Sequence, residues 1–173
     1  MFTIRTLGRF DLSQSTPGEP DVRILGSGKP LAVLTYLALH PKRSATREHL
    51  VGLLWRDKPE DRARGTLRQT VWTLRQLLGA DAIHATDDQL TLATQIDTEC
   101  LRFEAAIAAQ NHDAAWACYT GEFLPAFAPP GGSEFEQWAD LRRERLRQVW
   151  LTLGDIRARR FLNEGASADA IQV

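Results

Sequence analysis

The hydrophobic pattern of the chain is most regular between Glu60 and Gly79. At about 100° per residue, apolar side chains recur there on one side of a helix. This side carries Ala63, Leu67, Val71, Leu74 and Leu78. The opposite side carries Arg62, Gly65, Arg68, Gln69, Trp72, Arg75 and Gln76. The only carboxylate near that second face is Asp61, close to the helix start. The pattern predicts a helix with one buried face and one face of guanidinium and amide groups.

Short apolar segments on either side of this helix predict strands. Residues 2–12 alternate apolar and polar positions with a break at Gly8, which predicts two short strands, and residues 22–25 predict a third. Residues 82–85 and 90–92 predict a hairpin after the helix. Its turn is Thr86-Asp87-Asp88-Gln89, so two carboxylates stand at the tip, where they would repel phosphate.

Two further helices are expected before Glu60. Residues 30–40 are apolar nearly all round, which predicts a buried helix that ends at Pro41, and residues 42–45 are expected to be a basic connection. Residues 47–55 form a short amphipathic pattern, with Thr46 as its N-cap. The order of strands, three helices and a hairpin is typical of a winged helix-turn-helix.

The arginine-rich face supports two interpretations. Guanidinium and amide groups are the side chains that contact base edges and phosphates of a duplex. Arginine is also a good helix former, so a solvated surface helix is the alternative. Charge favours the first interpretation: residues 42–79 hold nine Lys/Arg against four acids, a net +5, whereas residues 97–140 hold one arginine against eight acids, a net −7.

Residues 97–173 predict a helical second half. Cys100, Phe103, Ile107 and Ala108 share one helical face, and residues 114–119 and 135–162 predict two more helices separated by the loop 125–133. A last helix is expected to begin at Ser167. The fold class is therefore mostly α with a small β component.

Composition narrows the functions to consider. The 173 residues are 43% hydrophobic and 25% charged, as in a globular protein. No apolar run reaches membrane-spanning length, and the start of the sequence lacks the apolar core expected of a signal peptide. Cys100 and Cys118 match no metal spacing and are expected to be buried free thiols in a reducing cytoplasm. The four histidines are scattered, and no catalytic grouping stands out. We expect no enzymatic activity, no metal, no cofactor and a cytoplasmic location.

Several short motifs together resemble one protein family. They are Leu7-Gly8-Arg9-Phe10, Leu34-Thr35-Tyr36-Leu37-Ala38-Leu39, Arg47-Glu48-His49-Leu50, Leu53-Leu54-Trp55, Ala63-Arg64-Gly65-Thr66-Leu67-Arg68-Gln69 and, later, Tyr119-Thr120-Gly121-Glu122-Phe123-Leu124-Pro125 and Glu136-Gln137-Trp138. In this order the chain resembles the Streptomyces antibiotic regulatory proteins (SARPs). The resemblance implies a response-regulator type winged helix-turn-helix DNA-binding domain (residues 1–94) and a tetratricopeptide-like bacterial transcriptional activation domain (residues 97–173, incomplete).

The resemblance implies a transcriptional activator that binds direct repeats in promoters through the helix 60–79. Its expected partner is double-stranded DNA, with RNA polymerase and a second copy of the chain as further candidates, and no membrane. The alternative is an adaptor that binds proteins through its helical half and has no specific DNA binding.

The chemistry of each exposed side chain indicates whether it would contact bases or phosphates of DNA. Arg68, Gln69 and Trp72 are the candidates for base contacts. Trp72 lies off the apolar stripe, so it could contact DNA or pack inside the protein, and packing is the slightly preferred role. Trp55 is expected in the core. The candidates for phosphate contacts are Lys42, Arg43, Arg47, Arg56, Arg62, Arg64 and Arg75.

Overall fold

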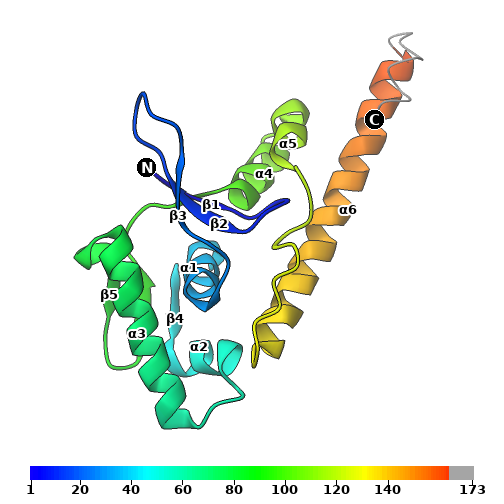
Figure 1. Ribbon diagram of the computed structural model, residues 1–173. Helices are drawn as coiled ribbons and strands as arrows, with labels where there is room; N and C mark the ends of the chain where they lie inside the picture. The colour runs from blue at the N-terminus through cyan, green and yellow to red at the C-terminus, as the bar shows by residue number, and fades with distance from the viewer. Residues whose placement is uncertain (164–173) are drawn as a thin grey trace.

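The computed structural model describes residues 1–163 and begins with a small sheet (Figure 1). Strands β1 (Phe2–Arg5), β2 (Asp11–Gln14) and β3 (Val22–Leu25) pair antiparallel, which confirms the three predicted strands. A fourth strand, β7 (Asp97–Thr98), pairs in parallel with β1 and gives the order β3-β2-β1-β7. Two residues carry no periodicity, so β7 could not be predicted from the sequence.

Three helices follow the sheet as predicted. They are α1 (Lys29–Leu39), α2 (Arg47–Leu54) and α3 (Glu60–Leu78). The Thr46 hydroxyl accepts the backbone N–H of His49, which confirms the predicted N-cap of α2. At the end of α3, Gly79 has a φ of 106°, a conformation that glycine adopts at little cost.

The hairpin belongs to a second sheet. After a short 3₁₀ turn, η1 (Ala80–Ala82), strands β5 (Ile83–Ala85) and β6 (Gln89–Leu92) form the predicted hairpin. Residues 42–45 were expected to be a plain connection, but Ser44 and Ala45 belong to a strand, β4 (Ser44–Thr46), that pairs antiparallel with β6. That expectation was wrong, because only a partner strand distant in sequence gives this short segment its hydrogen bonds. The order β4-β6-β5 joins the start of α2 to the wing.

The second half is helical. Helices α4 (Glu99–Ala108) and α5 (His112–Cys118) pack on each other, and α6 (Ser133–Asn163) runs along the side of the molecule opposite to α3 (Figure 1). The helix expected from Ser167 lies outside the described residues. Within residues 1–163, none of the helices combines the length and the apolar character needed to cross a membrane.

Hydrogen bonds tie the first sheet to the second half. The Glu99 carboxylate accepts the backbone N–H groups of Thr6 and Leu7 at 2.9 and 3.1 Å. The backbone N–H of Leu124 donates to the carbonyl of Thr6 at 2.8 Å, and that of Gly8 donates to the carbonyl of Glu122 at 2.8 Å. Buried residues from both sides of residues 95–96 form one hydrophobic core. The first sheet and the helical half are therefore held in one arrangement.

Candidate nucleic-acid interface

Helix α3 buries one face and exposes the other. All five residues of the predicted apolar stripe are buried, between 0 and 8% exposed. Arg62, Arg64, Arg68, Gln69, Trp72 and Gln76 are exposed. Trp72 keeps 57% of its surface exposed, so the interpretation that it packs inside the protein was wrong. The helical angle gave its direction, but only the positions of the neighbouring elements showed that nothing covers it.

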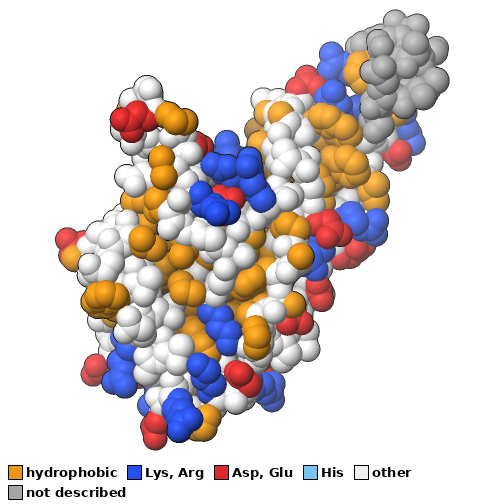
Figure 2. Space-filling view, viewed as in Figure 1, with side chains coloured by type: hydrophobic (Ala, Val, Ile, Leu, Met, Phe, Trp, Pro, Cys, Tyr) orange, Lys and Arg blue, Asp and Glu red, His pale blue; other side chains and the backbone are white. Residues whose placement is uncertain are grey.

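The elements around α3 leave its outer face open. Helix α1 packs on its buried side and α2 packs against it, while α6 lies on the far side of α2 (Figure 1). Figure 2 shows basic side chains, with acids between them, at the lower end of the molecule, over α2 and the first turns of α3. This is the arrangement of a helix-turn-helix in which the last helix is free to enter a groove.

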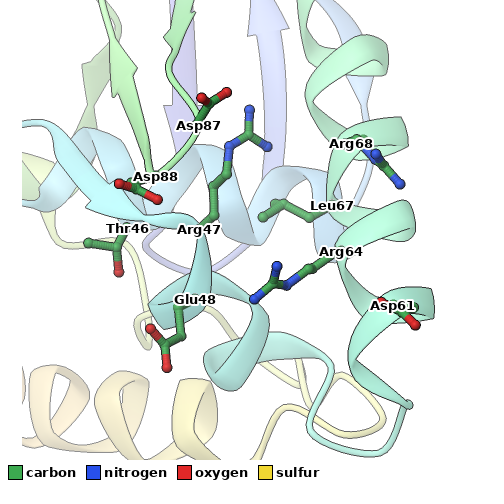
Figure 3. A pocket seen from close by; sticks show the side chains of 9 residues that line it. All are labelled: Thr46, Arg47, Glu48, Asp61, Arg64, Leu67, Arg68, Asp87 and Asp88. Atoms are coloured by element: carbon green, nitrogen blue, oxygen red, sulfur yellow. The ribbon is translucent and has the colours of Figure 1, made fainter.

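A cleft separates α3 from the tip of the wing (Figure 3). Its lining comes from the start of α2, from α3 and from the tip: Thr46, Arg47, Glu48, Asp61, Arg64, Leu67, Arg68, Asp87 and Asp88. Three cations therefore meet four acids, a formal net charge of −1. In Figure 3, Arg64 reaches toward α2, whereas Arg68 projects outward from α3. The net charge makes this side of α3 a poor place for phosphate.

Arg47 fixes the wing to the start of α2. Its backbone N–H donates to the carbonyl of Asp88 at 2.8 Å, and its Nε–H donates to the carbonyl of Thr86 at 2.9 Å. The turn closes through the Thr86 hydroxyl, which accepts the backbone N–H of Gln89 at 3.0 Å. The acidic tip is thus held at the mouth of the cleft, and part of the Arg47 side chain serves this purpose.

Two predicted phosphate contacts donate hydrogen bonds to backbone carbonyls of the protein itself. Arg75 donates from Nε and Nη2 to the carbonyl of Ile83, at 3.0 and 2.7 Å, which fastens the end of α3 to the wing. Arg43 donates to the carbonyl of Thr94. Arg56 forms an ion pair with Glu134 at the start of α6, but its side chain is 68% exposed, so this pair is weakly held. The hydrogen bonds of Arg75 and Arg43 make these two side chains less available to phosphate, because a position on a helical face does not tell which carbonyl the fold will bring to it.

With Arg56, five cationic predictions keep an exposed position. Lys42 and Arg62 are exposed, as is Arg68. Arg64 pairs with Glu60 one turn earlier at 2.5 Å; its side chain is 61% exposed, so the pair is weakly held. These cations and Gln69 are exposed at the surface.

A shallow hollow lies on the other side of α3 from the wing cleft. It is lined by Asp57, Lys58, Pro59, Arg62, Gly65, Thr66 and Gln69. The ammonium of Lys58 lies 3.4 Å from the hydroxyl of Thr66, which holds the loop between α2 and α3 beside the helix. Two cations against one acid make this side more favourable to phosphate than the cleft. Lys58 was not among the predicted contacts, although its place just before α3 was a usable signal.

Within the described part of the chain, no three His, Cys, Asp or Glu side chains are placed to hold a metal ion. Cys100 is a buried free thiol, as predicted, and burial raises its pKa to about 11, so it stays protonated at neutral pH. Cys118 is also free, but it is only half-buried, contrary to prediction.

The comparison with protein families agrees with this geometry. Residues 21–90, which run from β3 through the three helices to the wing, match the family described as "Transcriptional regulatory protein, C terminal". Over these residues the chain is similar to that family of transcriptional regulatory domains, and its order of helices and hairpin is consistent with a winged helix. In this winged helix, α3 is the helix with the open cationic face, and β5 and β6 are the wing.

A curated relative extends the similarity over both halves. The chain is 27% identical over 165 residues to the regulatory protein AfsR of Streptomyces griseus. The match covers 86% of this chain but only 16% of that protein. The similarity supports a transcription regulator and includes the helical half that follows the regulatory domain.

Proposed function

We propose that this protein binds specific promoter sequences as duplex DNA through the outer face of α3 and activates transcription. The observation that carries the proposal is that face: Arg62, Arg68 and Gln69 are exposed there beside a tryptophan that is 57% exposed. A large exposed aromatic side chain among cations leaves apolar surface in contact with water, and a binding partner would bury that surface. Duplex DNA offers such a partner phosphates, base edges and thymine methyl groups at the same time.

The proposed contacts divide by position on the helix. Arg68 and Gln69 read base edges, because they stand at the middle of the exposed face. Trp72 packs against a sugar or a thymine methyl. Arg62 and Lys58 contact phosphates on the side of the α2–α3 loop, where two cations line the hollow. Arg75 and Arg43 instead donate to the carbonyls of Ile83 and Thr94, and so act within the protein.

Activation and the direct-repeat arrangement rest on similarity and on geometry. One recognition helix contacts few base pairs, so we infer that two copies bind repeats about one helical turn apart. The similarity to AfsR supports a regulator of this type. The second half, net −7 over residues 97–140, has the wrong charge for DNA. We propose that it contacts the second copy or RNA polymerase.

Selection from a randomised duplex library tests DNA binding directly. The full chain is expected to enrich one sequence and to bind it in a gel shift with a steep loss of affinity from low to high salt. The same experiment separates the adaptor alternative, which is favoured by exposed apolar side chains on α6 such as Leu141, 77% exposed, and Leu162, 56% exposed. If the selection enriches no sequence and the gel shift shows no salt-dependent binding, the adaptor alternative is favoured.

Removing one phosphate contact has a distinct signature. Arg62→Ala is expected to weaken binding to the selected duplex and to random duplex alike, and to reduce the slope of log K against log salt by about 1. The exposed Arg159 of α6 supplies the matched control, because Arg159→Ala makes the same charge change far from α3. A sequence-dependent loss for Arg62→Ala would move Arg62 to the base contacts.

The acidic wing tip is expected to oppose binding. Asp87 and Asp88 are held at the mouth of the cleft by the bonds from Arg47, and a duplex against α3 brings phosphates near them. The double variant Asp87→Asn, Asp88→Asn is expected to raise affinity for any duplex about 30-fold at low salt, since each of the two carboxylates loses a like-charge contact that costs about 1 kcal/mol in water. Asp155→Asn on α6 is the control. Unchanged affinity would mean that the wing stays away from the DNA.

A further inference from the structure

Gly65 lies at the centre of the outer face of α3. It is a helical residue, one turn after Arg62 and one turn before Arg68 and Gln69, and it lines the hollow beside the α2–α3 loop. Glycine in the interior of a helix destabilises the fold relative to alanine, because the unfolded chain gains backbone freedom. A glycine at this position therefore needs a reason.

The protein itself supplies no such reason. A Cβ built on Gly65 would meet only the terminal Nη2 of Arg68, at 4.0 Å, and the backbone has no positive φ. Gly121 shows the contrasting case: a Cβ there would lie 2.7 Å from the Cα of Gly8, so the packing of two backbone segments requires glycine. Nothing within the described residues would resist a side chain at position 65.

The reason for a glycine at position 65 therefore lies with a binding partner and not with the fold of the chain. We infer that Gly65 is the point of closest approach between the backbone of α3 and duplex DNA, where the clearance is less than a methyl group. The inference rests on the proposed function and adds a positioning residue to it. The missing side chain lets α3 sit deeper, so that the exposed side chains one turn away on either side reach the bases and the phosphates.

The position of the neighbours favours DNA over a protein partner. The side chains one turn from Gly65 are Arg62, Arg68 and Gln69, all exposed hydrogen-bond donors. A protein surface that approached the helix backbone this closely would have to satisfy two guanidinium groups at once, whereas a groove presents acceptors on both of its walls.

Substitution at Gly65 separates stability from binding. Gly65→Ala in the full chain is expected to raise the melting temperature by about 1–4 °C, while affinity for the duplex selected by the wild-type protein falls about tenfold or more. Gly65→Gln, a larger neutral helix former, is expected to bind more weakly still.

Gly52 is the matched control. It also lies inside a helix, α2, and a Cβ there would meet only Glu134 Oε2 at 3.9 Å, on the side toward α6. Gly52→Ala is expected to raise the melting temperature similarly and to leave DNA affinity unchanged. This control shows whether a change in stability alone alters binding.

The outcomes are distinguishable. A higher melting temperature with weaker binding for Gly65→Ala, and unchanged binding for Gly52→Ala, supports the inference. Equal or tighter binding by Gly65→Ala, while Arg68→Ala still loses affinity, overturns the inference and leaves the proposed function standing. If the wild-type chain binds neither the selected duplexes nor bulk genomic duplex, the proposed function fails and this inference fails with it.

Discussion

Arg68→Ala is expected to weaken binding to the selected duplex by roughly 1–3 kcal/mol and to flatten the preference at one base pair. Arg68 is exposed and projects outward from the middle of α3, while its neighbour Leu67 is 1% exposed and anchors the helix. Its guanidinium forms no ion pair with any other residue of the described chain, so the substitution leaves no buried charge behind. The loss should therefore appear in binding and not in folding.

The measurement is a gel shift on the selected duplex and on all single-base variants of it. Arg68→Lys is the informative control, because it keeps the charge but loses the forked pair of donors that matches guanine. It should retain affinity for random duplex and lose the base preference. An equal loss on selected and random duplexes for Arg68→Ala would remove Arg68 from the base contacts.

Phe123→Ala is expected to cost about 3–5 kcal/mol of the free energy of unfolding, a large part of the total for a domain of this size. The ring is fully buried, 5.9 Å from the ring of Trp138, and the backbone of Phe123 forms a β-bridge with Leu7. Arg143 Nε also donates to its carbonyl at 3.0 Å. The residue thus fills the space between the first sheet and α6.

Urea unfolding followed by tryptophan fluorescence and by circular dichroism measures this cost. Because the two halves share one core, both probes are expected to report a single transition for the wild type, and the variant should shift that transition as a whole. Leu141→Ala is the control, since Leu141 is 77% exposed on the same helix as Trp138. Two separate transitions would mean that residues 1–94 and 97–173 fold independently.

The parts of the fold that the sequence predicted are those with strong local periodicity or local hydrogen bonds. The apolar stripe of α3 fixed which face is buried, and the Thr46 N-cap fixed the start of α2. Strands β4 and β7 were missed, because segments of two or three residues become strands only through partner strands 43 to 94 positions away. The boundary between the halves was drawn at residues 95–96, and the structure adds β7 and the Glu99 carboxylate, which bridge it.

In the candidate site too, features set by neighbouring residues were predicted, and features set by residues distant in sequence were not. Helical angles correctly placed Arg62, Arg68 and Gln69 on the exposed face. They could not show that the carbonyl of Ile83 binds Arg75, or that Glu134 pairs with Arg56. The helical pattern placed Gly65 on the outer face, but only the structure shows that no other part of the described chain packs against it.

The sequence by itself determined that this protein has a helix with an apolar back and a guanidinium and amide front, set between two shorter helices and a hairpin. The reason is that helical periodicity, caps and turns depend on residues within a few positions of one another. Only the tertiary structure decided which cations remain exposed, that Trp72 is uncovered and that an acidic tip stands beside α3. Those features depend on contacts between residues far apart in the chain, and the linear pattern does not contain them.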